Sequence, residues 1–421
     1  MSYLLTCPAC RSRFPDDGSR LSCPYGCVSL LQTLYSDPHA PLDESAHGIG
    51  RYHRRLPGIA RPLQSGLPVV IDLPWLTART PQLKLSVVFS GWWPERGAHM
   101  PSASFKDLEA AAVLARLALR PQSCLVLASA GNTAAAFASA CTRLHRRCII
   151  IVAASALGRI RLPQPQGASV TVIAIDDPAT YDDAIALSRA IADDDYFLLE
   201  GGVRNVARRD GMGIALGVAL ERSAQGPDAY LQAIGSGAGA IAVWEAAGRA
   251  QQKRPELALP RLGLSQNAPF SPVTRSYSRQ SPVLLADDPA IAKRQIAQIM
   301  APVLSNMAPP YALPGGIFDA LRASQGQMAS VSNAAALSAW HEFREREGVA
   351  LDGAAAVTLA SLSQFPPSFL PAGSRVLVHL TGGSDLNDHD RPRIPLRANI
   401  TLSYEHAQQV TTAHALRERL R

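Results

Sequence analysis

Lysine is scarce in this chain, because arginine supplies all but four of the 41 basic side chains. The four lysines are Lys84, Lys106, Lys253 and Lys293. A guanidinium group stays charged in proteins, whereas an amine can lose its proton and form a Schiff base with a carbonyl compound. Arginine therefore cannot replace lysine in chemistry of that kind.

Long apolar runs and aromatic residues are also few. The longest apolar run, residues 148–157, is too short to span a bilayer, and the start of the chain has no basic flank leading to an apolar segment. Aromatic residues make up 6% of the chain, and the net charge of +7 is dispersed along it. These features do not favour a nucleic-acid partner, and the charge suits an enzyme for anionic substrates equally well. We expect a cytoplasmic protein with no membrane or nucleic-acid partner.

The seven cysteines, an odd number, argue against a disulfide framework. Cys124, Cys141 and Cys148 stand in apolar or helical surroundings and are predicted to be small buried residues. The other four form two pairs separated by twelve residues, in the segments 7–10 (CPAC) and 23–27 (CPYGC). These pairs resemble the two knuckles of a zinc ribbon, although the second knuckle is one residue longer than usual. The pattern predicts a structural zinc ion on Cys7, Cys10, Cys23 and Cys27, with a vestigial, metal-free ribbon as the alternative.

Alternating strands and helices are predicted from about residue 83 onward, after a connector over residues 36–76 that is rich in Pro, Gly, His and Arg. Strands are predicted over residues 83–89, 124–128, 148–153, 169–175, 196–199, 230–234 and 376–380. Helices are predicted over residues 105–119, 134–144, 181–193, 211–223 and 240–250. The alternation is typical of a parallel sheet covered by helices, and the length allows two main domains.

Three segments at the ends of predicted strands or the start of a helix carry candidate chemistry. Lys106 lies in PSASFKD (residues 101–107), and Ser129-Ala130-Gly131-Asn132-Thr133 follows the next strand. Together these two resemble the aldehyde-binding lysine and the ring-cradling loop of a pyridoxal phosphate enzyme. The third is a glycine-rich turn, residues 235–239 (GSGAG), whose backbone amides and helix N-terminus suit a phosphate. Alone, such a turn is as often a dinucleotide site or a tight turn, but beside Lys106 it favours the phosphate of this cofactor.

A further strand ends in Thr381-Gly382-Gly383-Ser384. The Thr381 hydroxyl is a candidate partner for the pyridine nitrogen of the cofactor, and a capping or turn threonine is the alternative. A neutral partner does not hold that nitrogen protonated, so the ring is a weaker electron sink. This favours eliminations and replacements over transamination.

On these motifs the chain resembles the tryptophan synthase beta group of pyridoxal phosphate enzymes, also called fold type II. Within that group it is similar to the threonine synthase branch, where an N-terminal cysteine cluster also occurs. The cysteate synthase subgroup is nearest, on residues 201–213 (GGVRNVARRDGMG) and 239–245 (GAIAVWE). Leu108, where threonine synthases usually have Arg, and the Gly-Gly after Thr381 in place of Gly-His-Gly count against threonine formation.

The resemblance implies a role for each motif residue. Lys106 would bind the cofactor aldehyde and remove the substrate α-proton, Asn132 would bind the ring hydroxyl, and Thr381 the ring nitrogen. The phosphate would lie on Gly235, Ser236, Gly237, Ala238 and Gly239. Substrate would be bound by Ser104, Ser129, Ala130, Gly131, Thr133, Arg204 and Arg208. For the arginines, guanidinium groups suit a phosphate or sulfonate, and the alternative is that Arg204, Arg208 and Arg209 form a solvated face or pair with Asp210.

The implied fold is α/β, with two open doubly wound domains and the cofactor between them. Its expected parts are a zinc-ribbon-like segment (1–35), a large pyridoxal phosphate-binding domain (36–109 with 231–421) and a small mobile domain (110–230). The implied reaction is β-replacement on a small-molecule amino-acid substrate: O-phosphoserine and sulfite would give cysteate and phosphate. Alternatives are a threonine synthase acting on O-phosphohomoserine, an amino-acid lyase, and an inactive binding or regulatory homologue. A homodimer is typical of the group.

Overall fold

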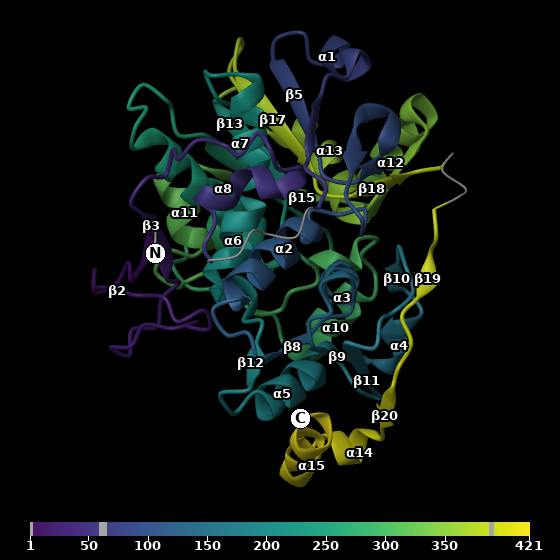
Figure 1. The fold of residues 1–421 in the computed structure, drawn as a ribbon. Helices are drawn as coiled ribbons and strands as arrows, with labels where there is room; N and C mark the ends of the chain where they lie inside the picture. Colours follow the sequence, from purple (N-terminus) through teal and green to yellow (C-terminus); the bar gives the residue numbers. More distant parts are fainter. Residues whose placement is uncertain (1–2, 59–64, 387–390) are drawn as a thin grey trace.

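The computed structural model describes residues 3–58, 65–386 and 391–421, and in it two parallel sheets carry helices on their faces (Figure 1). The six-stranded sheet has the order β15 (Gln327–Val331), β14 (Arg261–Asn267), β13 (Ala229–Ala233), β17 (Arg375–Leu380), β5 (Lys84–Phe89) and β4 (Val69–Ile71). Only its edge strand β4 is antiparallel to its neighbour. The five-stranded sheet has the order β12 (Phe197–Leu199), β8 (Cys124–Ala128), β9 (Cys148–Ala153), β11 (Val170–Ile175) and β20 (Ile400–Leu402), all parallel. The predicted α/β class is confirmed.

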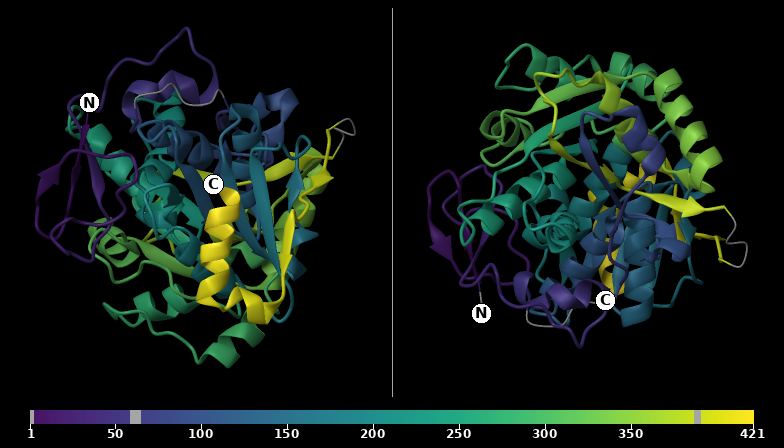
Figure 2. Two further views of the ribbon diagram at one scale, coloured as in Figure 1. Left: turned by 60° about the horizontal axis from the view of Figure 1, so that its bottom comes forward. Right: turned by 90° about the horizontal axis from the view of Figure 1, so that it is seen from above.

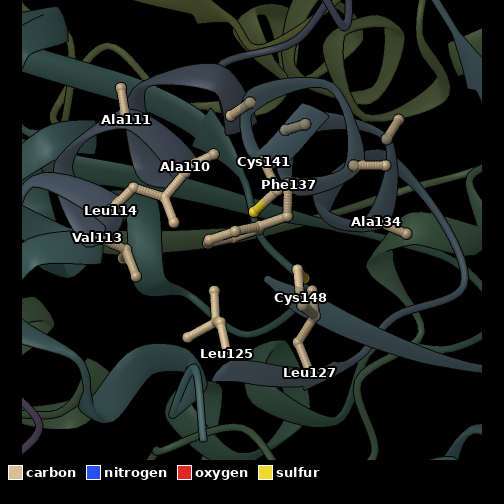
Figure 3. Packing of buried hydrophobic residues seen from close by; sticks show 14 of the residues in the cluster. Ala110, Ala111, Val113, Leu114, Leu125, Leu127, Ala134, Phe137, Cys141 and Cys148 are labelled. Carbon is tan, nitrogen blue, oxygen red and sulfur yellow. The ribbon is translucent and has the colours of Figure 1, made fainter. Parts of the chain in front are cut away.

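The core explains why these strands form. Every residue of β9 (CIIIVA) is buried, as expected for a parallel strand covered on both faces. On one of these faces lie two alanine-rich helices, α2 (Lys106–Leu117) and α3 (Asn132–Leu144). Figure 3 shows Phe137 and Cys141 of α3 packed with Leu125 and Cys148 of the sheet. Burying each large apolar side chain contributes about 1.5–3 kcal/mol. Cys124, Cys141 and Cys148 are all buried, as predicted.

The remaining helices cover the two sheets. They are α1 (Pro74–Arg79), α4 (Ala154–Leu157), α5 (Tyr181–Ile191), α6 (Val206–Met212), α7 (Ile214–Arg222), α8 (Ala238–Gln251), α9 (Pro272–Ser278), α10 (Pro289–Ile296), α11 (Ile317–Ala323), α12 (Asn333–Glu347), α13 (Gly353–Ser361), α14 (Tyr404–Ala407) and α15 (Val410–Leu420). Short 3-10 turns are η1 (Gly48–Arg55), η2 (Pro94–Arg96), η3 (Gly202–Arg204), η4 (Pro302–Leu304) and η5 (Leu362–Gln364). Among the described residues, none of these helices has both the length and the apolar character needed to cross a membrane.

One predicted helix, residues 211–223, begins too late. The structure has α6 from Val206 and, after Gly213, a second helix α7. The Asn205 side chain starts α6 by accepting a hydrogen bond from the Ala207 amide, 3.1 Å away. Gly213, between the two helices, packs closely on α8: a Cβ there would lie 3.0 Å from both the carbonyl oxygen of Ala242 and the Cβ of Ala246. The motif arginines therefore lie on a helix.

The C-terminal segment adds more to the fold than its sequence indicates. Strand β18 (Gly383–Asp385) joins β16 (Val349–Leu351), β6 (Trp92–Trp93) and β7 (Ala98–His99) in a small sheet. The chain then pairs β19 (Ile394–Pro395) with β10 (Arg161–Leu162), and β20 with β11. Figures 1 and 2 show this yellow segment running from the six-stranded sheet to the five-stranded sheet, where it ends in α14 and α15. Residues 394–395 thus pair with β10 in a two-stranded sheet and residues 400–402 join the five-stranded sheet, although both lie in the range expected for the large domain. The domain boundaries stay a prediction.

The N-terminal segment forms a separate antiparallel ribbon, in the order β2 (Arg13–Phe14), β1 (Tyr3–Thr6) and β3 (Gln32–Tyr35). It lies against α6 on one side of the molecule (Figure 1). Of the predicted connector 36–76, residues 59–64 lie outside the described part of the chain, and the rest holds η1, β4 and the start of α1.

Candidate active site

Lys106 lies at the first turn of α2, directly after a loop that is paired with the end of β17. The Phe105 amide donates to the Thr381 carbonyl over 2.9 Å, and the Gly383 amide donates to the Ala103 carbonyl over 3.0 Å. Ser104 and Gly382 form a β-bridge between these contacts. The lysine loop and the predicted ring-nitrogen residue therefore meet at the carboxyl end of a parallel strand, where such sheets bind ligands.

Phe105 joins three of the predicted motifs, and sequence reasoning did not single it out. Its ring centroid lies 4.6 Å from the Lys106 Nζ. A Cβ on Gly239 would lie 2.9 Å from a carbon of the same ring and 2.6 Å from the Gln232 side chain. Glycine is required at 239 because the loop passes directly over Phe105. The position of Phe105 next to the lysine was its only sequence signal.

The glycine-rich loop has the conformation expected of a phosphate cradle. It links β13 to α8, whose fourteen residues give it a full helix dipole. Gly237 has φ of +71°, a left-handed conformation that other residues rarely adopt. A Cβ on Gly235 would approach the Val303 carbonyl oxygen to 2.9 Å. Glycine thus occupies the positions where the loop packs most closely on its neighbours. The backbone that the loop offers to a phosphate belongs to Gly235, Ser236, Gly237, Ala238 and Gly239.

The segment 129–133 and this loop both lie close to Val303. A Cβ on Gly131 would lie 3.8 Å from the Val303 side chain, the residue whose carbonyl also faces Gly235. The Ser129 hydroxyl accepts a hydrogen bond from the Ala134 amide at 3.0 Å, which fixes the turn into α3. Asn132 begins α3, with Ala130 beside it in the turn. The structure therefore brings this predicted segment to the same region as the glycine-rich loop.

A buried charge network surrounds Lys106, and two of its carboxylates were not predicted. The Lys106 Nζ lies 3.1 Å from Glu109, and the Arg208 guanidinium lies 3.0 Å from Glu109 and 2.8 Å from Glu200. Arg208 also approaches the Thr133 hydroxyl to 3.4 Å. Burial lowers the pKa of Lys106, and the Glu109 carboxylate opposes this shift. An amine with a lowered pKa loses its proton more readily, as nucleophilic attack requires.

The arginine segment is buried and ion-paired, so the alternative of a solvated basic face is wrong. Arg208 is 10% exposed on its side chain, and Arg209 is fully buried against Glu245 at 3.0 Å. Asp210 pairs with Arg249 at 3.0 Å rather than with its neighbours. Arg204 lies half-buried in η3, and among the described residues its guanidinium has no ion pair to the network around Lys106. A substrate role for Arg204 and Arg208 stays a prediction.

The four N-terminal cysteines converge as a metal site requires. Their sulfur atoms all lie within 4.8 Å of one another, and those of Cys10 and Cys23 are 3.7 Å apart. A tetrahedral zinc ion with Zn–S bonds of about 2.3 Å places its sulfurs about 3.8 Å apart. The longer second knuckle is accommodated by Gly26, which has φ of +78° and donates its amide to the Cys23 carbonyl at 3.1 Å. Cys7, Cys10, Cys23 and Cys27 therefore suit a closed structural zinc site.

A buried histidine, His379, packs against the ring of Phe105. His379 of β17 lies 2.8 Å through Nε2 from the Ser90 hydroxyl and 2.6 Å through Nδ1 from the Tyr230 hydroxyl. Its ring meets Phe105 edge-on at 5.7 Å. Burial lowers the pKa of His379 from 6.5 to about 3. The ring is therefore neutral at physiological pH.

This shift predicts a pH dependence of stability. Because the folded pKa of His379 lies below the unfolded value, its contribution is complete above about pH 6.5 and is lost as the pH falls toward 3. We expect this residue alone to lower the free energy of unfolding by about 1.4 kcal/mol per pH unit between pH 6 and 4. Urea unfolding of wild type, His379→Gln and the exposed-site control His414→Gln would measure it. Equal slopes in wild type and His379→Gln would contradict the assignment.

The comparisons with known proteins place the chain in a family. A family model described as "Pyridoxal-phosphate dependent enzyme" matches residues 78–382, so the chain belongs to the family of pyridoxal-phosphate dependent enzymes. Cysteate synthase of Methanoculleus marisnigri is 40% identical over 387 residues, which cover 90% of this chain and 88% of that protein. Cysteate synthase of Methanosphaerula palustris is 41% identical over 386 residues, covering 90% and 89%. The resemblance to the threonine synthase and cysteate synthase relatives is thereby confirmed.

Solved structures show the fold. The structure of maize serine racemase matches with a TM-score of 0.58 and 17% identity, over 76% of this chain and 89% of that one. Threonine deaminase isoform 2 from Solanum lycopersicum matches with a TM-score of 0.56 and 15% identity, over 78% and 86%. The cofactor of the family, pyridoxal phosphate, fits the described residues. Lys106 offers an amine on a side chain that is 17% exposed, and Thr381 offers a buried hydroxyl. The loop 235–239 offers a cradle in which Gly237 and Gly239 leave no room for a Cβ.

Proposed function

We propose that this enzyme catalyses β-replacement on a phosphorylated amino acid. O-phosphoserine and sulfite are the substrates, and L-cysteate and phosphate are the products. The observation that carries the proposal is the 40% identity to cysteate synthases over 90% of the chain. The structure supports it with a largely enclosed lysine amine, on a loop that is hydrogen-bonded through Phe105 to the buried Thr381 after β17.

In this proposal the motif residues divide cofactor binding, proton transfer and substrate binding among them. Lys106 attaches the cofactor, Asn132 binds the ring hydroxyl, Thr381 the ring nitrogen, and the loop 235–239 the phosphate. Bound pyridoxal phosphate supplies an electron sink for the electrons left at the substrate α-carbon. The Lys106 amine takes the α-proton and holds it on Nζ. The substrate is bound by Ser104, Ser129, Ala130, Gly131 and Thr133. Arg204 and Arg208 bind its anionic group.

The wider proposal covers the metal, the assembly and the location. A structural zinc ion is held by the four cysteines of the ribbon, since four thiolates leave no open position for catalysis. The enzyme works as a homodimer in the cytoplasm, as is typical of the group. Domains 36–109 with 231–421 and 110–230 close on the site and keep water away from the reacting carbon atoms.

Product analysis tests the reaction. Incubation of the loaded enzyme with O-phosphoserine and sulfite is expected to release cysteate and phosphate in equal amounts, measured by mass spectrometry and phosphate assay. With O-phosphohomoserine we expect a turnover at least about a hundredfold lower, because a site that places the β-carbon for attack misplaces a γ-carbon. Threonine as the main product would point to a threonine synthase. Pyruvate and ammonia, with no sulfite consumed, would point to a lyase.

A further inference from the structure

The carboxylate of Glu109 touches the reactive amine. It lies one helical turn after Lys106 on α2, with Oε2 3.1 Å from Nζ. Its other oxygen, Oε1, lies 3.0 Å from the Arg208 guanidinium. The side chain is fully buried, so solvent does not screen either contact. One carboxylate thus joins the amine of the cofactor motif to an arginine of another helix.

Arg208 is in turn held from its far side. Glu200 lies 2.8 Å from the guanidinium and accepts a hydrogen bond of the same length from the Gly202 amide. The side chains of Arg208 and Glu200 are 10% and 5% exposed. The signs alternate from Lys106 through Glu109 and Arg208 to Glu200, so the fully ionised cluster is neutral. A buried cluster of this kind keeps a fixed geometry because any unpaired member is costly.

The charged groups that face Lys106 come from four parts of the fold. They are Glu109 from α2, Arg208 from α6, Glu200 after β12, and Asp352 at the N-terminus of α13. Burial lowers the pKa of the Lys106 amine, Glu109 raises it as the largest opposing influence, and Arg208 lowers it. Burial raises the pKa of Asp352. Glu109 is therefore the principal group that allows an ammonium ion to exist at this buried position.

We propose that Glu109 is a positioning residue for Lys106, fixing the direction of Nζ and stabilising the proton that Nζ takes, while Arg208 and Glu200 hold Glu109 in place. The proton removed from the substrate rests on Nζ, within 3.1 Å of the Glu109 carboxylate. What Lys106 does in turnover rests on the proposed function. The contact itself depends only on the geometry of α2 and α6.

The test compares Glu109→Gln with Glu200→Gln in the full chain. Each variant removes one carboxylate charge from the same cluster, but only Glu109 touches the amine. Protein without added cofactor receives a brief pulse of acetic anhydride at a series of pH values, and peptide mass spectrometry measures acetylation at each lysine. Only the neutral amine has a lone pair that can attack the anhydride, so the midpoint pH reports how tightly Nζ holds its proton. Lys84, Lys253 and Lys293 serve as internal references.

We expect the Lys106 midpoint to fall by about one pH unit or more in Glu109→Gln, a tenfold weaker hold on the proton, and by less than a third of that in Glu200→Gln. In the loaded enzyme, the pH at half-maximal kcat is expected to move the same way, whereas a merely structural defect would lower kcat without moving it. An equal shift in both variants would overturn the proposal, as would no shift in a Glu109→Gln chain that circular dichroism shows to be folded.

A second variant and the choice of reagent keep the two proposals separately testable. If Glu109→Gln fails to fold, Glu109→Asp keeps the charge but withdraws it by one carbon, and an unchanged Lys106 midpoint in that variant counts against the proposal. Acetylation requires neither sulfite nor a phosphorylated amino acid. A failure of the proposed reaction therefore leaves the labelling result intact, and a failed labelling result leaves the reaction standing.

Discussion

Replacing Lys106 by alanine is expected to lower turnover by at least about a thousandfold and to abolish the visible absorption band of bound cofactor. The variant loses both the amine that attaches the cofactor and the base that takes the α-proton, and a positioned base alone is worth about 10²–10⁴ in rate. The other lysines cannot substitute: Lys253, for example, is 53% exposed and paired with Asp37. Absorption spectra and cysteate formation measure the two losses.

A matched variant separates chemistry from packing. Lys106→Ala leaves the buried Glu109 carboxylate with Arg208 as its remaining ion-pair partner, so part of any loss could be structural. Lys106→Arg keeps a cation beside Glu109 but cannot form a Schiff base. An equally large loss in both variants assigns the effect to the amine, and Lys253→Ala controls for the loss of a lysine elsewhere. Wild-type absorbance and turnover in Lys106→Arg would contradict the assigned role.

Most of the regular structure could be predicted because its strands are short apolar runs that end at glycine or serine turns. The bounds of β8 and β9 are those expected, and β5, β11 and β17 differ by one residue at one end. The exceptions are strands that owe their existence to distant partners. β20 has three residues, none of them fully buried, and forms by pairing with β11. Its Ile and Thr are common in strands, but three residues are too short a segment to indicate one without the pairing partner.

The site shows the same division between local and distant signals. The motif residues converge because loops at strand ends meet, which the order of elements already implies. Glu109 could have been found as well, since three residues after Lys106 on a helix is a neighbouring position. Glu200 could not, because it reaches the lysine only through Arg208. A solvated face stayed open as the alternative for the arginines, because the carboxylate partners of Arg208 and Arg209 lie on other elements.

Disruption of the zinc site proposed for the ribbon is the second change with a large expected effect. The ribbon has strands of only two to four residues, and its core includes Tyr3, Leu5, Leu31 and Val206 of α6. So small a core cannot hold a fold alone. In zinc-finger peptides, binding of structural zinc contributes an apparent free energy of about 10–16 kcal/mol to folding. We expect Cys23→Ser to lose its zinc, measured by elemental analysis, and to lower the melting temperature by at least about 5 °C.

Loss of zinc from the ribbon is expected to disturb the active site through α6. Thr33 and Tyr35 of β3 each donate to Asp210 at 2.6 Å, and Asp16 of the ribbon pairs with the buried Arg116 of α2 at 2.7 Å. Asp210 stands two residues after Arg208 on the same helix, so a loosened ribbon frees the element that holds Glu109 beside Lys106. Hydrogen exchange in α6 is therefore expected to speed up in Cys23→Ser, and turnover is expected to fall by at least about tenfold. Cys148→Ser, a core change away from the ribbon, is the control and is expected to keep its zinc. Unchanged exchange in α6 of a zinc-free variant would show that the ribbon stabilises only itself.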